Sequence, residues 1–137
     1  MGDEVCARLR AALAPGGATV PWAGVVRVES DCRRRLTTDR SFLDSLAVCL
    51  GRHARCDWGS ISPHTRRRNE DALRIFRETG TLLEAPDGLY SRYELAGGVV
   101  LRIKSGAYTF AEHITTVHLE EGAPAWDSRT MRRRRAS

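Results

Sequence analysis

The residues best suited to chemistry lie between positions 49 and 57, where two cysteines, a histidine and an aspartate follow one another closely. Cys49, His53 and Cys56 have the spacing C-x3-H-x2-C, and Cys32 could complete a set of four zinc ligands. Cys49 and His53 are four residues apart and so share a helical face, from which two side chains can bind one metal ion. The sequence lacks the paired C-x2-C elements typical of zinc sites, and we expect no metal or other cofactor.

The same stretch contains the residue types of a nucleophilic enzyme. His53, Asp57 and the Cys56 thiol could form a nucleophile with its base, although catalytic side chains usually come from separate elements. A small metal-independent nuclease is a further alternative, in which His53, His113 or His118 performs general acid–base catalysis. The sequence has no glycine-rich phosphate loop and no Walker motif. We expect no catalytic residues, no enzymatic activity and no small-molecule substrate.

A structural interpretation competes with both chemical ones. Asp57 can accept hydrogen bonds from backbone N–H groups two residues further on, and Gly59 can adopt a positive φ. Trp58 between them can turn inward as a large apolar anchor. Asn69 falls on the apolar face of the helix that follows. We therefore expect Asp57, Trp58, Gly59 and Asn69 to be structural residues of a corner between two helices.

Three helices are expected to position these residues. The first begins at a cap provided by Asp3 and ends before Pro15-Gly16-Gly17. The second begins after Thr37-Thr38-Asp39, because apolar residues then recur with helical spacing. The third begins at Ser62-Pro63, where the serine can cap the helix and proline occupies the first helical position, and it ends at Gly80.

After Gly80 the apolar spacing changes from helical to alternating, which is typical of strands. Strands are expected at residues 81–85, 89–95, 99–104 and 114–119, and residues 24–29 form either a strand or an extended connection. The sequence thus predicts an α+β fold, with N-terminal helices packed on one face of a C-terminal antiparallel β-meander of three to four strands. We assign residues 1–126 to this single domain and residues 127–137 to a basic, arginine-rich tail.

The positive charge is concentrated in the tail. The net charge is +5, and residues 127–137 carry +4 of it. A second basic group lies in the first turns of the third helix, where cations meet the positive end of the helix dipole and require acidic partners. We expect these groups and one strand face to contact a protein partner or nucleic acid. The expected binding residues are Arg66, Arg67, Arg68, Tyr90, Arg92, Arg132, Arg133, Arg134 and Arg135.

No apolar run in the sequence is long enough to span a membrane. Residues 1–14 carry charges and lack the continuous apolar stretch of a signal peptide. We therefore expect a cytoplasmic protein without a membrane partner.

The order of several short motifs resembles that of small, mostly uncharacterised proteins carried by phages, plasmids and integrated elements. The resemblance covers about residues 37–121, and Cys56 departs from it by standing where that family usually has glycine. It implies an accessory protein of a mobile element and no particular reaction. The matching residues are Arg52-His53, Asp57-Trp58-Gly59, Asn69, Ala72-Leu73, Gly80, Leu82-Leu83, Ala85, Tyr93, Leu95, Gly98 and Thr115-Thr116-Val117.

The sequence and this resemblance together suggest a non-catalytic protein of a mobile genetic element. Our leading hypothesis is that it binds and inhibits a host defence complex of the CRISPR or restriction type, as an anti-CRISPR protein would. The second hypothesis is sequence-nonspecific binding to nucleic acid through the arginine clusters, with an affinity that falls as salt rises. The third is the small metal-independent nuclease.

Overall fold

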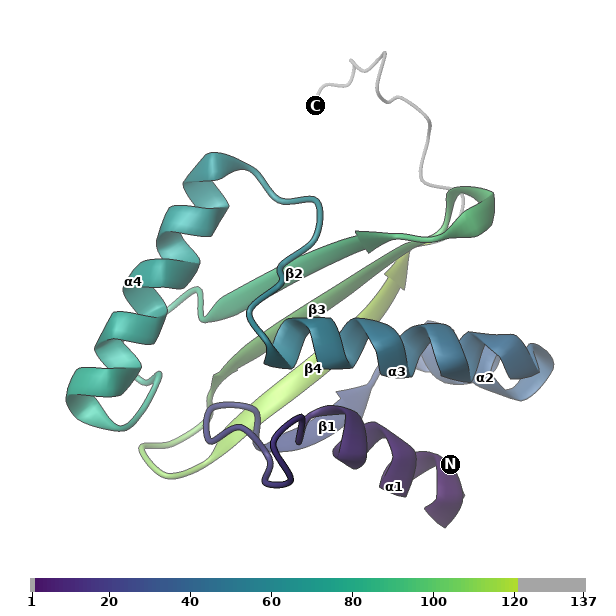
Figure 1. Ribbon diagram of the computed structural model, residues 1–137, viewed down its shortest axis with the longest axis horizontal. Helices are drawn as coiled ribbons and strands as arrows, with labels where there is room; N and C mark the ends of the chain where they lie inside the picture. Colours follow the sequence, from purple (N-terminus) through teal and green to yellow (C-terminus); the bar gives the residue numbers. More distant parts are fainter. Residues whose placement is uncertain (1, 121–137) are drawn as a thin grey trace.

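A computed structural model of the protein describes residues 2–120. Helices come first along the chain, interrupted by one strand, and three strands follow (Figure 1). The elements are α1 (Asp3–Ala12), β1 (Val25–Val28), α2 (Ser30–Thr38), α3 (Arg40–Ala54), α4 (Pro63–Thr79), β2 (Leu89–Glu94), the short 3-10 helix η1 (Ala96–Gly98), β3 (Val100–Ala107) and β4 (His113–Glu120).

Local signals set the ends of the two longest helices. The Asp39 carboxylate accepts a hydrogen bond from the Ser41 N–H group at 3.1 Å and caps α3. The Ser62 hydroxyl accepts from the N–H group of Thr65 at 3.1 Å at the start of α4, and Gly80 ends this helix with φ of 79°. These helix boundaries confirm the sequence prediction, because each depends only on side chains within a few residues of the helix end.

The first third of the chain differs from the prediction in two respects. Asp3 is the first residue of α1, and its side chain makes no capping bond there. The helix α2 was not predicted, because its sequence SDCRRRLTT contains few apolar residues and buries only Cys32 fully. Contacts with α3 and β4, rather than an apolar stripe in its own sequence, hold α2 in place.

The four strands form one sheet in the order β1-β4-β3-β2. Strands β2, β3 and β4 make an antiparallel meander, which confirms the predicted α+β class. The sheet is mixed, however, because β1 pairs with β4 in parallel. A parallel pair requires a long crossover connection rather than a hairpin, and the segment between β1 and β4, which contains α2, α3 and α4, provides one.

The predicted strand at residues 81–85 is absent, and this segment forms turns instead. Side chains satisfy its backbone: Leu82 N–H donates to His113 Nε2 at 3.0 Å, and Leu83 N–H donates to Thr81 Oγ1 at 3.2 Å. Thr81, Leu82 and Ala85 are buried, which is not the alternation of a strand. The apolar residues at this point therefore close the end of the core and do not extend the sheet.

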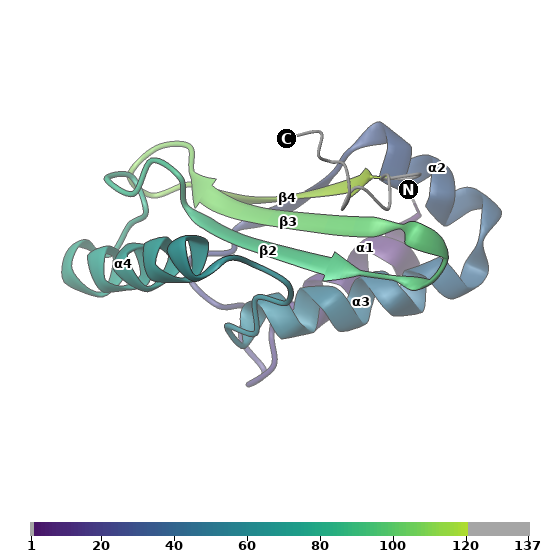
Figure 2. The ribbon, with the colours of Figure 1, turned by 90° about the horizontal axis from the view of Figure 1, so that it is seen from above.

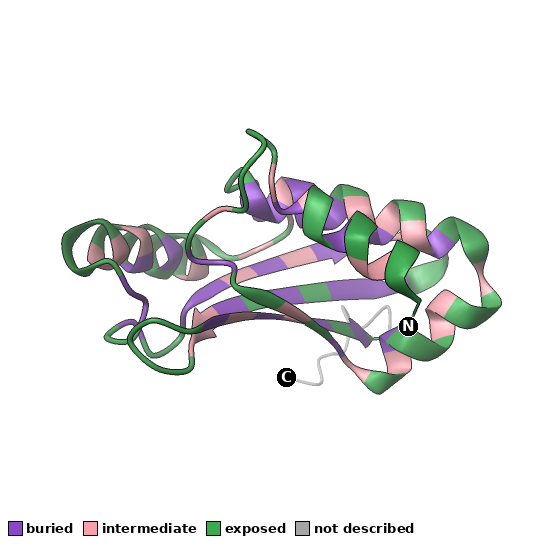
Figure 3. Cartoon of the chain, turned by 90° about the horizontal axis from the view of Figure 1, so that it is seen from below, coloured by how far each residue is buried: buried purple, intermediate pink, exposed green. Residues whose placement is uncertain are grey.

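The hydrophobic core lies between one sheet face and the helices. Helices α1 and α3 lie on the same side of the sheet (Figures 1 and 2), and the strands alternate between buried and exposed residues (Figure 3). The core side chains of the sheet include Leu89, Tyr93, Leu101, Ile103, Val117 and Leu119. No helix within residues 2–120 has both the length and the apolar character needed to cross a bilayer.

Candidate binding surface

His53, the residue with the most obvious chemical potential, lies in the core and is fully buried. Its ring contacts the rings of Trp22 and Trp58 edge-on, with centroids 5.4 Å and 5.5 Å away. Its Nδ1 lies 2.5 Å from Ser91 Oγ, and its Nε2 lies 2.9 Å from Ser105 Oγ. Both ring nitrogens are therefore occupied by hydroxyl groups, and neither is free to bind a metal or to reach a substrate.

The direction of each hydrogen bond around His53 follows from counting protons. Thr115 Oγ1 donates to the carbonyl oxygen of Ala23 at 2.7 Å, so the Ser105 hydroxyl must donate to Thr115 Oγ1, 2.7 Å away. Ser105 Oγ then accepts from His53 Nε2–H, and Nδ1 accepts from the Ser91 hydroxyl. Burial lowers the pKa of His53 to about 3, which keeps the ring neutral, as this chain of bonds requires.

The other candidate catalytic and metal-binding residues do not gather around His53. His113 accepts from a backbone N–H group at one end of the core, and burial lowers its pKa. His118 is exposed on the sheet face away from the helices. Cys49 is buried and Cys56 exposed, and within residues 2–120 no three histidine, cysteine or acidic residues lie close enough to hold a metal ion.

The segment from Asp57 to Gly59 covers the outer edge of β2. Arg92 N–H donates to the carbonyl oxygen of Trp58 at 3.0 Å, and Gly59 forms a parallel bridge with Arg92. Gly59 has φ of 76°, and a Cβ atom added there would lie 2.2 Å from the Arg92 carbonyl oxygen. The corner needs glycine both for its backbone conformation and for this close approach.

Further contacts fix the same corner. Asp57 and Arg52 form an ion pair with 2.8 Å between Oδ2 and Nε, and this bond lowers the pKa of the aspartate. The Tyr93 hydroxyl donates to the Asp57 carbonyl oxygen at 2.6 Å. Asn69 of α4 is buried and bonds both backbone groups of Tyr90, at 2.8 Å and 3.0 Å. A helix and a loop thus cover the β2 edge, where open backbone groups would otherwise attract another strand.

The sheet face opposite the helices is open, and we call it the outer face. Its exposed and half-exposed side chains line up across the strands in the observed register, so that Tyr90, Lys104, Thr116 and Arg27 form one row. Arg92, Arg102 and His118 form the next row. The outer face consists of Val25, Arg27, Tyr90, Arg92, Glu94, Arg102, Lys104, Ile114, Thr116, His118 and Glu120.

Most cations of the outer face have a carboxylate partner. Arg92 pairs with Glu94 at 2.6 Å, and Arg102 pairs with Glu120 at 3.0 Å. These pairs relieve the repulsion between two arginines that stand opposite each other on neighbouring strands. Arg27 similarly pairs with Glu29 at 3.3 Å.

Lys104 differs from its neighbours on the outer face. It is exposed and makes no ion pair with any residue in the described part of the chain. The two residues beside it on the neighbouring strands are Tyr90 and Thr116, which carry no charge. Among the outer-face cations of the described residues, Lys104 is therefore the one whose charge can bind an acidic group of a partner without breaking an ion pair.

The predicted binding residues within residues 2–120 lie on two elements, the arginine cluster on α4 and Tyr90 with Arg92 on β2. Arg66, Arg67 and Arg68 are exposed on α4, and Arg68 pairs with Asp87 at 3.1 Å. The arginines of α2 lie at the opposite end of the molecule, because α2 and α4 occupy its two ends (Figures 1 and 2). Arg132, Arg133, Arg134 and Arg135 lie outside the described residues.

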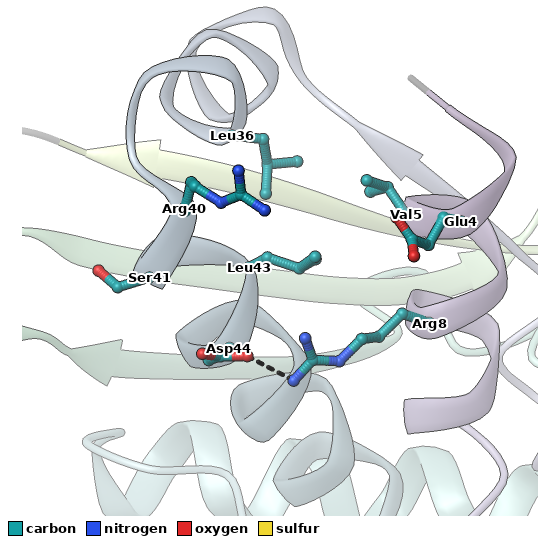
Figure 4. A pocket seen from close by; sticks show the side chains of 8 residues that line it. All are labelled: Glu4, Val5, Arg8, Leu36, Arg40, Ser41, Leu43 and Asp44. Carbon is teal, nitrogen blue, oxygen red and sulfur yellow. Dashed lines mark ion pairs between the residues drawn. The ribbon is translucent and has the colours of Figure 1, made fainter.

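A groove between α1, α2 and α3 has a cavity volume of 640 Å³ (Figure 4). Arg8 and Asp44 form an ion pair across it at 2.6 Å. Glu4 and Arg40 also line the groove, so its charges cancel. Such a lining does not select a charged ligand of either sign.

Sequence reasoning identified Tyr90 and Arg92 but missed Arg102 and Lys104. The signal was present, since residues 99–104 were expected to form a strand, in which alternation turns Arg102 and Lys104 to the face opposite Leu101 and Ile103. What the alternation could not supply was which strands lie side by side.

Comparison of the chain with family models, curated proteins and solved structures gives no match.

Proposed function

We propose that this is a non-catalytic binding protein that docks its outer face on a partner protein. The observation that carries the proposal is an open sheet face with tyrosine, arginine and lysine side chains, while the rest of the sheet is covered by helices and the β2 edge by a loop. Tyrosine and arginine are enriched where proteins bind one another. Strand pairing fixes the backbone of the outer face, so no segment of this face has to fold when a partner binds.

We propose further that the partner belongs to a host defence complex of the CRISPR or restriction type. This part of the proposal is supported by the sequence resemblance to mobile-element proteins. A small domain that occupies a functional surface of such a complex needs no reaction of its own. The location of His53 in the core, where substrate does not reach it, is in keeping with such a role.

Direct binding to nucleic acid is the second candidate. It is supported by Arg66 and Arg67, which are exposed in the first turns of α4 and form no ion pair within residues 2–120. The outer face supports it less well, since Glu94 and Glu120 stand beside the arginines and would repel phosphate groups.

The test compares two variants that each remove two positive charges. The outer-face variant is Arg92→Ser with Arg102→Ser, and the control is Arg33→Ser with Arg34→Ser on α2, whose arginines are exposed. Each protein is expressed in bacteria that carry a defined CRISPR or restriction system, and phage plating is measured. Tagged protein is recovered in parallel after nuclease treatment and a high-salt wash.

The wild-type protein and the α2 control are expected to raise phage plating and to retain the defence complex. The outer-face variant is expected to lose both effects while unfolding at the same temperature. Equal behaviour of the two variants would contradict docking through the outer face. Capture that disappears with nuclease would instead support the nucleic-acid candidate.

A further inference from the structure

A hollow opens at one end of the outer face, beside Lys104. Its cavity volume is 320 Å³, and it lies between the 82–86 turn and the ends of β3 and β4. The turn contributes Leu82, Leu83 and Pro86, and the sheet contributes Ile114 and Thr116 besides Lys104. Because the 82–86 segment forms turns rather than a strand, it borders the sheet and leaves this depression beside it.

The side chains that line the hollow are apolar apart from one cation and one hydroxyl, although polar atoms contribute at least as much of its accessible surface as apolar atoms do. No acidic residue lines it, and Lys104 has no carboxylate partner within residues 2–120. Leu83, in the turn beside the hollow, is 49% exposed. The hollow therefore combines apolar side chains with an ammonium group that makes no ion pair within residues 2–120.

Apolar side chains continue beyond the hollow. Val25 is 67% exposed and stands opposite Ile114 in the parallel pair of β1 and β4. The loop between β3 and β4 carries Tyr108 and Phe110, which are 73% and 60% exposed. This end of the sheet thus holds most of the exposed large apolar residues in the described part of the chain, as expected for the centre of a protein-binding surface.

We propose that the hollow beside Lys104 receives an apolar side chain from an acidic segment of a protein partner, with a neighbouring aspartate or glutamate of that segment bound to the lysine. This inference rests on the proposed function and specifies the chemistry of the partner. A nucleic acid fits less well, because the described residues that line the hollow include no aromatic ring for a base to stack on and one cation, Lys104. The charge of Lys104 favours an acidic residue in the partner's segment, and the apolar side chains of the hollow favour an apolar residue next to it.

The experiment uses a random-peptide display library as the probe and the full-length chain as the immobilised target. Selections are run in parallel on the wild-type protein, on Lys104→Glu and on the control Arg33→Glu, which reverses one exposed charge on α2. The wild type and the control are expected to enrich peptides with a large apolar residue next to aspartate or glutamate. Lys104→Glu is expected to bind these peptides at least about tenfold more weakly and to enrich basic flanks instead.

The inference is overturned if enriched peptides carry no acidic flank, if no peptide is enriched, or if the selected peptides bind Lys104→Glu as well as the wild type. A single-stranded oligonucleotide that binds in place of the peptides and depends on Lys104 would also overturn it. Failure here is distinguishable from failure of the proposed function. If the defence complex is still lost with the Arg92 and Arg102 changes but retained with Lys104→Glu, the outer face docks and only the role of the hollow is wrong.

Discussion

Replacing Thr115 with valine tests the buried hydrogen-bond chain that links the sheet to α3. Threonine and valine have the same shape, so the change removes a hydroxyl without opening a cavity. Thr115 donates to the Ala23 carbonyl oxygen and accepts from Ser105, and all three residues are buried. The variant therefore leaves one buried acceptor and one buried donor without partners.

The expected cost follows from these two groups. A buried polar group that loses its partner costs about 1–3 kcal/mol, and burying a methyl in place of a hydroxyl returns up to about 1 kcal/mol. For two such groups these values give about 1–6 kcal/mol, and we expect Thr115→Val to lower the free energy of unfolding by about 3 kcal/mol. In a domain of this size, that corresponds to a fall in Tm of roughly 10 °C.

Urea denaturation measures this difference, and the neighbouring residue supplies a matched control. Thr116 lies on the same strand but is half-exposed on the outer face, and its hydroxyl makes no hydrogen bond within the described residues. Thr116→Val should change stability by no more than about 0.5 kcal/mol. Equal effects of the two substitutions would refute the buried chain as a source of stability.

The same reasoning fixes the protonation of His53. The Thr115 hydroxyl donates to a carbonyl oxygen, so the Ser105 hydroxyl donates to Thr115 and accepts from His53 Nε2. The neutral imidazole must therefore carry its single proton on Nε2. The nitrogen chemical shifts of the ring, measured by NMR at neutral pH, report this tautomer directly. A proton found on Nδ1 would show that the bonds run in the opposite direction.

Three further predictions concern the corner and the core. Gly59→Ala should destabilise the protein by more than about 2 kcal/mol, while Gly97→Ala, at a similar φ of 78° but with no atom within 4 Å of the added Cβ, should cost only the backbone strain of about 1 kcal/mol. A comparison of their unfolding free energies isolates the clash, and equal losses would contradict it. Asn69→Ala removes two hydrogen bonds to the β2 backbone and should cost about 2–3 kcal/mol and speed amide exchange in β2, whereas the exposed Glu70→Ala should do neither. Unchanged exchange in β2 would speak against the edge-covering role. Burial lowers the pKa of His53 to about 3, so the unfolded state takes up a proton below pH 6.5 that the folded state does not. The stability from this residue is complete above pH 6.5 and should fall by about 1.4 kcal/mol per pH unit as the pH drops towards 3. Urea titrations at pH 7, 6 and 5 measure the slope, and a flat profile would show that the imidazole takes up its proton in the folded protein at the same pH as in the unfolded chain.

Interactions between residues close together in the sequence set the ends of the long helices and the positions of three strands, so these elements could be predicted from the sequence. The caps at Asp39 and Ser62 and the left-handed Gly80 act within one helical turn, so reading a few residues suffices to place α3 and α4. Alternating apolar residues determined β2, β3 and β4 for the same reason. The α2 helix escaped prediction because tertiary contacts, and not an apolar stripe, stabilise it.

The role of His53 was decided by the tertiary structure. Its position on an apolar helical face fits a ligand, a base or a core residue equally well. The bonds that make it a core residue come from Ser91 and Ser105, on two different strands far along the chain. The spacing of residues around a histidine in the sequence does not indicate which hydroxyl groups will hydrogen-bond to it after distant strands have paired.

The candidate binding surface illustrates the same division. Alternation along each strand determined that Arg92, Arg102 and Lys104 turn away from the core, because successive side chains point to opposite faces. Arg92 meets Glu94 two residues along its own strand, whereas the pair of Arg102 with Glu120 and the uncharged neighbours of Lys104 depended on the register of the strands. Sequence periodicity specifies the face on which a side chain lies, whereas its neighbours across the sheet are set by strand pairing over long distances along the chain.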